Sequence, residues 1–111
     1  MPRQGELWMA SLDPVKGSEQ SGYRPVLIVS GDLLNQNLSV RWVVPLTTKM
    51  PGYAGNPQLE PNDGNGLSQP SEVLVLHLRS MDRSRLIQRL GCVEPEVVRR
   101  VHETVGKILR Y

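Results

Sequence analysis

The sequence predicts a small, mainly β domain, a strongly bent barrel or sandwich that ends in one helix. Three observations predict this fold. Apolar stretches of strand length recur along residues 5–93, and Gly, Pro and Asn separate them. The clearest helical periodicity lies at the C-terminal end. The chain has 111 residues, 39% of them apolar and 22% charged, so we expect one domain over residues 1–111.

Five stretches are expected to form the main strands. One of them, residues 25–30, is an unbroken apolar run, which indicates burial on both faces. A short helical turn is expected at 31–35, and a minor strand at 58–60 inside a turn-rich region over 48–71. The five predicted strands cover residues 5–12, 25–30, 40–47, 73–78 and 85–93.

The C-terminal helix is expected to begin near Pro95, which suits the first helical position. Glu94 and Glu96 suit the positive end of the helix dipole. Six apolar residues recur at helical spacing and mark the face that packs on the strands. They are Val97, Val98, Val101, Val105, Ile108 and Leu109.

Composition and charge limit the cellular setting and the class of partner. No run of about 18 apolar residues occurs and no apolar signal segment opens the chain, so we expect a cytoplasmic protein without a membrane span. The single Cys92 excludes an internal disulfide. Residues 79–111 hold eight Lys/Arg against four Asp/Glu, a balance that suits a phosphate backbone, an acidic partner or a solvated helix face.

Two polar segments next to predicted strands are candidates for chemistry. Arg24 ends a polar loop and precedes the buried strand at 25–30, so it is either a surface residue of a hairpin or a fixed cation beneath a binding groove. Thr47, Thr48 and Lys49 lie at the end of another buried strand, either as ordinary strand-end polarity or as phosphate ligands. No metal-ligand spacing and no Gly-rich phosphate loop is present, and no cofactor is expected.

Sequence motifs along nearly the whole chain resemble the MazF/PemK toxin family, the mRNA interferases of type II toxin–antitoxin systems. The most specific part is a Gly-Ser-Glu-Gln loop followed by Arg-Pro. The matching stretches are Gly5-Glu6-Leu7-Trp8, Leu12–Gln20, Arg24–Ser30, Val43–Thr48 and Arg79–Leu86.

The resemblance implies a homodimeric SH3-like barrel that acts as an endoribonuclease on single-stranded RNA. It implies sequence-specific, metal-independent cleavage of mRNA, with 2′,3′-cyclic phosphate and 5′-hydroxyl products. It also implies a cognate antitoxin whose acidic, disordered tail occupies the RNA groove. DNA is then contacted only through the antitoxin, and no membrane is involved.

The same resemblance assigns roles to individual residues. The family's catalytic positions correspond to Arg24 and Thr47, and Glu19 corresponds to a position important for activity. Metal-free cleavage uses the 2′-hydroxyl of the substrate as nucleophile, so the protein must orient the phosphate, stabilise charge and move protons. Arg24 suits charge stabilisation, Thr47 suits phosphate binding, and Glu19 is the candidate base. Family positions near the RNA groove correspond to Ser18, Gln20 and Arg79, and Thr48 beside Thr47 is a further RNA-binding candidate.

One departure from the family pattern concerns the segment before Arg79. Relatives often carry an acidic residue and then Gln there, whereas this chain has Leu76 and His77. An imidazole titrates near neutral pH and can donate, accept or stack, so His77 is either an acid/base or base-reading residue of the groove or a solvent-facing bystander.

Two alternative functions stay open from sequence. One is a non-catalytic toxin of the same fold that inhibits gyrase, like the CcdB toxins, although this chain lacks their terminal Trp-Gly-Ile segment. The other is a degenerate member that binds only antitoxin or RNA, which the loss of the carboxylate at Leu76 makes plausible.

Overall fold

The computed structural model describes residues 2–12 and 22–111 and has a mainly β fold with a C-terminal helix, which confirms the predicted class. The candidate residues Ser18, Glu19 and Gln20 lie outside the described residues. The strands are β1 (Glu6–Ser11), β2 (Tyr23–Ile28), β3 (Val40–Thr47), β4 (Gln58–Leu59), β5 (Ser71–Val73), β6 (Arg79–Asp82) and β7 (Leu86–Cys92). The helices are α1 (Asp32–Asn37), α2 (Pro95–Arg110) and two 3₁₀ turns, η1 (Val75–His77) and η2 (Arg83–Arg85).

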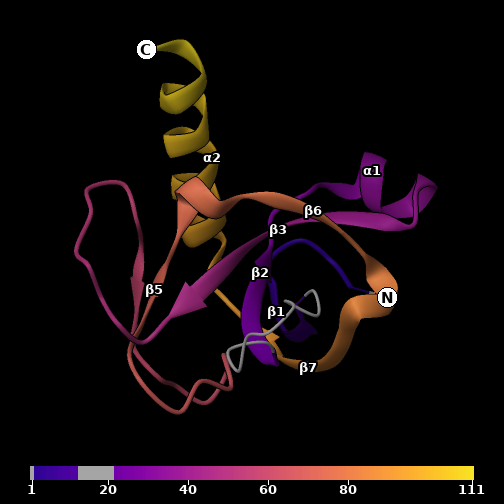
Figure 1. Cartoon of the computed structure of the whole chain (residues 1–111), viewed down its shortest axis with the longest axis horizontal. Helices are drawn as coiled ribbons and strands as arrows, with labels where there is room; N and C mark the ends of the chain where they lie inside the picture. Colours follow the sequence, from indigo (N-terminus) through magenta and orange to yellow (C-terminus); the bar gives the residue numbers. More distant parts are fainter. Residues whose placement is uncertain (1, 13–21) are drawn as a thin grey trace.

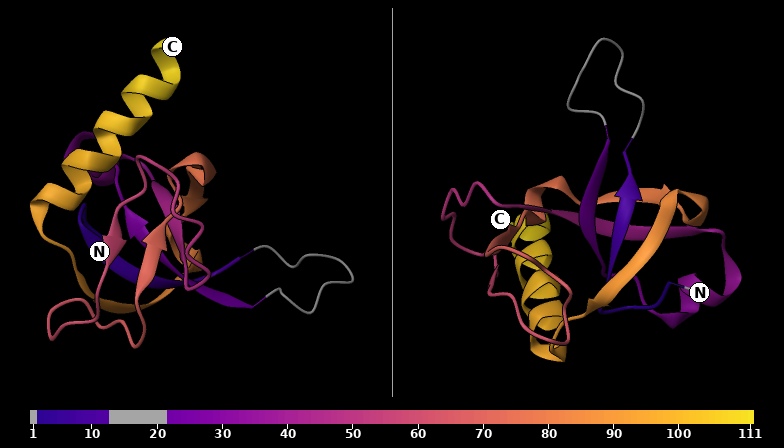
Figure 2. Two further views of the ribbon diagram at one scale, coloured as in Figure 1. Left: turned by 90° about the vertical axis from the view of Figure 1, so that its left-hand side faces the viewer. Right: turned by 90° about the horizontal axis from the view of Figure 1, so that it is seen from below.

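The strands form one antiparallel sheet that curls into a partly closed barrel of the SH3-like kind. β1 lies between β2 and β7, and β2 lies beside β3. The other edge of β3 pairs with β6 over Val40–Val43 and then with β5 over Leu46–Thr47. Because only η2 separates β6 from β7, these strands at opposite ends of the order β6-β3-β2-β1-β7 must approach each other. Figures 1 and 2 show the continuous segment from β6 to β7 arching around β1–β3.

Alternating side chains of the central strands fill two cores, one on each face of the sheet. Leu27 and Val44 belong to the core beneath α2, whereas Val26, Ile28 and Val43 belong to the core inside the barrel. The prediction that the run at 25–30 is buried on both faces is therefore confirmed.

Helix α2 covers one of these cores with the predicted stripe, but only over its first part. Val98 and Val101 are buried in the core that contains Leu7 and Leu27. The last turn extends past the barrel, as Figure 2 shows, and Leu109 is 79% exposed. Among the described residues, no helix is long and apolar enough to cross a membrane.

The predicted strand at 73–78 is wrong. Its beginning belongs to β5, and its second half forms η1. The chain leaves the sheet because the amide of His77 donates to the Leu74 carbonyl (3.0 Å) and the amide of Leu78 donates to the Val75 carbonyl (3.1 Å). This turn redirects the chain into β6, a strand that the sequence analysis did not predict.

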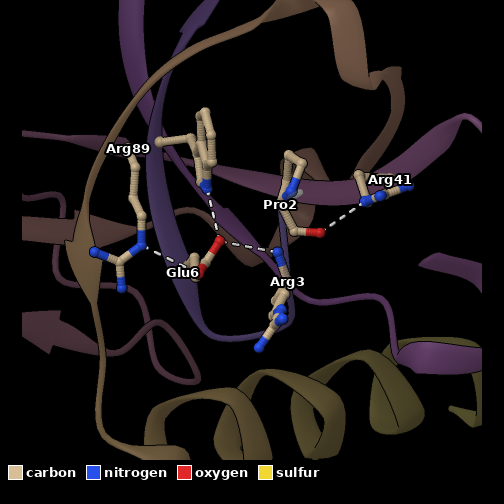
Figure 3. Close-up of polar contacts among 6 residues, drawn as sticks. Pro2, Arg3, Glu6, Arg41 and Arg89 are labelled. Carbon is tan, nitrogen blue, oxygen red and sulfur yellow. Dashed lines mark hydrogen bonds and ion pairs between the residues drawn. The ribbon is translucent and has the colours of Figure 1, made fainter. Parts of the chain in front are cut away.

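Polar ties fix the N-terminal segment against the barrel (Figure 3). The fully buried Arg41 donates from Nε to the Pro2 carbonyl (2.9 Å). The Glu6 carboxylate accepts from the Arg3 amide and the Trp8 indole (2.9 Å each) and from Arg89 (3.1 Å). Burial raises the pKa of Glu6, but these donors outweigh it, so this pKa lies below its ordinary value. The start of β1 is thereby held to β7 and β3.

Candidate active site

Arg24 is the second residue of β2, just before the buried residues of that strand. It is half-buried and lies opposite Ala10 in the β1–β2 pairing. Opposed residues of an antiparallel pair share a face of the sheet. Ala10 is fully buried, so Arg24 begins at the edge of the core to which Ala10 belongs.

Thr47 is the last residue of β3 and is also half-buried. Its hydroxyl accepts a hydrogen bond from the Lys49 amide (3.1 Å). The β2–β3 pairing sets Val26 opposite Pro45, so continuing this antiparallel register by two residues brings Arg24 opposite Thr47. The two candidate catalytic residues therefore belong to the same end of adjacent strands.

His77 lies with Thr47 on the wall of a shallow depression of about 400 Å³. It is the last residue of η1 and is exposed, so it is not buried in the core. The depression thus combines a hydroxyl and an ammonium from residues 47–49 with an imidazole from a second part of the sequence. Its lining residues are Thr47, Lys49, Met50, Pro51, Tyr53, Leu74 and His77.

The other two described candidates lie next to this region. Thr48 directly follows β3 and is exposed. Arg79 begins β6, is exposed, and pairs with Val43 on β3, four residues before Thr47 along that strand. Neither belongs to the described residues that line the depression.

Sequence reasoning missed two residues of this region. Tyr53 lines the depression from the turn-rich segment, and an aromatic residue among Gly and Pro was the only available signal. Glu72 on β5 is fully buried and lies opposite Thr47. Burial raises the pKa of Glu72, but side-chain donors from Asn56 and Gln58 and the amides of Gly52 and Tyr53 lower it below the ordinary value.

This arrangement suits a phosphodiester substrate. Arg24 and Lys49 carry basic side chains, Thr47 carries a hydroxyl able to hydrogen-bond a phosphate, and His77 carries an imidazole, a side chain suited to proton transfer. Within residues 2–12 and 22–111, no group of three or more His, Cys, Asp or Glu is arranged to hold a metal ion.

Known endoribonucleases are similar to this chain over nearly its full length. Endoribonuclease EndoA of Bacillus subtilis is 28% identical over 104 residues, which cover 93% of this chain and 90% of that protein. Endoribonuclease toxin MazF of Escherichia coli K12 is 28% identical over 109 residues, covering 98% and 95%.

Solved structures share the fold. The crystal structure of MazF from Deinococcus radiodurans superposes with a TM-score of 0.79 at 31% identity, covering 99% of this chain and 97% of that one. A MazE–MazF complex from the same organism gives a TM-score of 0.76 at 28% identity, covering 98% and 95%.

Fold, site and relatives together define an endoribonuclease of the toxin class. A family model for the PemK-like, MazF-like toxins of type II toxin–antitoxin systems matches residues 3–109, and the chain belongs to this family.

Proposed function

We propose that this toxin cleaves single-stranded mRNA at a short sequence motif, without a metal, through attack of the substrate's own 2′-hydroxyl. The observation that carries the proposal is the β2–β3 pairing, which runs from Ile28 to Val26 and so leaves Arg24 and Thr47 at the same end of adjacent strands. The products are then a 2′,3′-cyclic phosphate and a 5′-hydroxyl. Residues 1–111 act as a single toxin domain, in the cytoplasm where the substrate is found.

Each candidate residue has a role in this reaction. Arg24 offers its guanidinium to the nonbridging phosphate oxygens and stabilises the charge that develops on them. A guanidinium is a poor base, so Arg24 is given no proton-accepting role. Thr47 donates a hydrogen bond to the scissile phosphate. Glu19 is the candidate base, and His77 is a second group that moves a proton or contacts a base edge.

The remaining candidates contact RNA away from the reacting atoms. Ser18 and Gln20 flank Glu19 in the sequence, and their hydrogen-bonding groups suit base edges or sugar oxygens. Thr48 and Arg79 are both exposed near the depression and suit phosphate contacts. Base edges are read by hydrogen bonds in unstacked RNA, so the contacts of Ser18 and Gln20 contribute to the recognised motif, whereas phosphate contacts position the RNA.

We further propose a homodimer. On one chain, Trp42 (48% exposed) and Leu109 line an apolar groove with Leu34, Leu78 and Val105, where α2 extends past the barrel. A second copy related by a two-fold axis covers both grooves at once. Light scattering is expected to give twice the 12.4 kDa chain mass, and a single-chain mass would contradict the dimer.

The proposed regulator is a cognate antitoxin. Structures of MazE–MazF complexes are among the similar folds, and the supporting chemistry here is the cationic region around Arg24, Lys49 and Arg79. An acidic, disordered segment of the antitoxin suits the same groove as RNA. DNA contact then belongs to the antitoxin alone. None of the relatives reported above is named as a gyrase-binding toxin.

The cleavage chemistry is tested with two RNAs that differ in one oxygen. A fluorescent RNA that carries the mapped motif is incubated in excess EDTA beside the same RNA with 2′-deoxyribose at the scissile nucleotide. We expect full cleavage of the first, with a cyclic phosphate end, and none of the second. Cleavage of the deoxy substrate, or loss of all cleavage in EDTA, would overturn the proposal.

A further inference from the structure

The described residues beside Thr47 include a buried carboxylate that organises a loop. Glu72 is fully buried, and its carboxylate accepts hydrogen bonds from the backbone amides of Gly52 (2.9 Å) and Tyr53 (3.2 Å). It also accepts from the side-chain amides of Asn56 (2.9 Å) and Gln58 (3.3 Å). All these donors belong to residues 52–58, so one charge is solvated by a single segment of the chain.

The same network connects this segment to the candidate active site. Glu72 lies opposite Thr47 in the β3–β5 pairing. The side chain of Asn56 accepts a further hydrogen bond from the amide of Val75 (3.1 Å), the first residue of η1, which ends at His77. Segment 52–58 is therefore fixed relative to both Thr47 and His77.

Within this fixed segment, the backbone of Tyr53 is hydrogen-bonded while its side chain is exposed. Its amide donates to Glu72, whereas its side chain is 62% exposed and lines the depression shared by Thr47, Lys49 and His77. An exposed aromatic ring next to cationic and hydroxyl groups is the arrangement that binds single-stranded nucleic acid, because bases stack on the ring while the cations contact the backbone.

We propose that Tyr53 is a stacking surface for a nucleobase next to the scissile phosphate, and that Glu72 is the positioning residue that holds it there. This inference rests on the proposed RNA-cleaving function and adds a substrate subsite to it. Because every base has a π-face, stacking contributes affinity with little preference for sequence. The subsite therefore acts on RNA binding more than on the chemical step.

The first test measures binding and cleavage separately for substitutions of Tyr53. Binding is followed by the anisotropy of the RNA that is 2′-deoxy at the cut site, and cleavage by the kcat and KM of the matching RNA. Tyr53→Ala is expected to raise Kd and KM about 10-fold or more with little change in kcat. Tyr53→Phe keeps the ring and is expected to behave as wild type. Tyr111→Ala removes a 96% exposed tyrosine at the C-terminus, outside the depression, and serves as the control.

The second test asks whether Glu72 acts through Tyr53. Glu72→Gln replaces an acceptor oxygen by a donor that faces other donors, and we expect it to raise Kd in the same direction as Tyr53→Ala. The double variant is expected to bind no worse than Tyr53→Ala alone, because the two residues serve one contact. If Glu72→Gln does not fold, Asn56→Ala removes one donor of the network and takes its place in the same cycle.

The outcomes separate the inference from the function on which it rests. Wild-type binding by Tyr53→Ala, in a wild type that cleaves RNA, overturns the stacking subsite alone. Additive effects of the Glu72 and Tyr53 substitutions overturn the positioning role. A wild type that neither cleaves nor binds RNA overturns the proposed function and the subsite together.

Discussion

The sequence identified some residues of the candidate site and gave no indication of others. Thr47 and His77 were selected separately, 30 positions apart, and the structure brings them to one depression. Glu72 gave no signal, because its hydrogen-bond partners lie 14–20 positions away in a turn-rich segment without periodicity. A buried carboxylate in a strand is recognised only when its donors are known. Roles at Glu19, Ser18 and Gln20 remain predictions, since these residues lie outside the described part of the chain.

At the residue scale, the role of His77 is tested by its pH dependence. His77→Gln keeps hydrogen-bonding capacity but removes the imidazole that lines the depression, a side chain suited to acid/base work. We expect the pH profile of kcat to become flatter between about pH 5 and 8, or the preferred cleavage motif to change. Single-turnover rates across this range, with sequencing of the cut sites, measure both. An unchanged profile together with an unchanged motif makes His77 a bystander.

Elements with a clear period could be predicted, whereas those set by tertiary contacts could not. The stripe from Val97 to Val105 correctly identified the packed face of α2, because helical spacing and the core agree. The apolar run at 73–78 satisfies a strand pattern, yet the chain has to leave β5 and enter β6, so tertiary connectivity overrides local preference and forms η1. The short strand β6 lacked an apolar pattern of its own.

At the element scale, the contact between β7 and the loop that joins β4 to β5 predicts different stability effects for substitutions at two glycines. A Cβ added at Gly91 would lie 2.2 Å from the carbonyl oxygen of Gly64, which is backbone and has little freedom to move. Gly91→Ala is expected to lower the free energy of unfolding by about 2 kcal/mol or more. Gly64→Ala meets only the Asn62 side chain at 3.5 Å and serves as the control, with a change within about 0.5 kcal/mol. Equal stabilities of the two variants in urea titrations would contradict this packing.

The whole molecule is a partly closed barrel with one core on each face of its sheet. The candidate site lies where β2 begins and β3 ends. The cores follow from alternating apolar residues, so the sequence predicted them well. The closure of the barrel depends on η2, which joins β6 and β7, and three consecutive residues in a 3₁₀ turn carry no recognisable pattern. Family resemblance supplied this part of the prediction, and the similar solved structures confirm it.

At the scale of the whole molecule, three carboxylates make the free energy of unfolding depend on pH. Hydrogen bonds from Ser84 lower the pKa of Asp82, and donors outweigh burial at Glu6 and Glu72, so all three lie below their ordinary values of 3.8 and 4.5. Groups with a lowered folded-state pKa contribute stability above the ordinary value and lose it as the pH falls through the folded value. We therefore expect constant carboxylate stabilisation near pH 6 and a progressive loss below about pH 5.

Urea titrations between pH 6 and pH 3 measure this loss. Glu6→Gln removes one of the linked groups and is expected to reduce the slope of stability against pH. Glu103→Gln, on the exposed side of α2, is the control and should keep the wild-type slope. The same slope in wild type and Glu6→Gln would exclude Glu6 as a contributor.

We propose that the strand ends carrying Arg24 and Thr47 form the catalytic site of this RNA-cleaving toxin. The most direct test maps cleavage sites on a long unstructured RNA in excess EDTA, for wild type, Arg24→Ala and Arg99→Ala. Arg99 is an exposed arginine of α2 and keeps the net charge of the two variants equal. We expect cuts at one short motif for wild type and Arg99→Ala, and a loss of at least about 100-fold for a folded Arg24→Ala. Undiminished cleavage by Arg24→Ala, or no cleavage by the wild type, would contradict the claim.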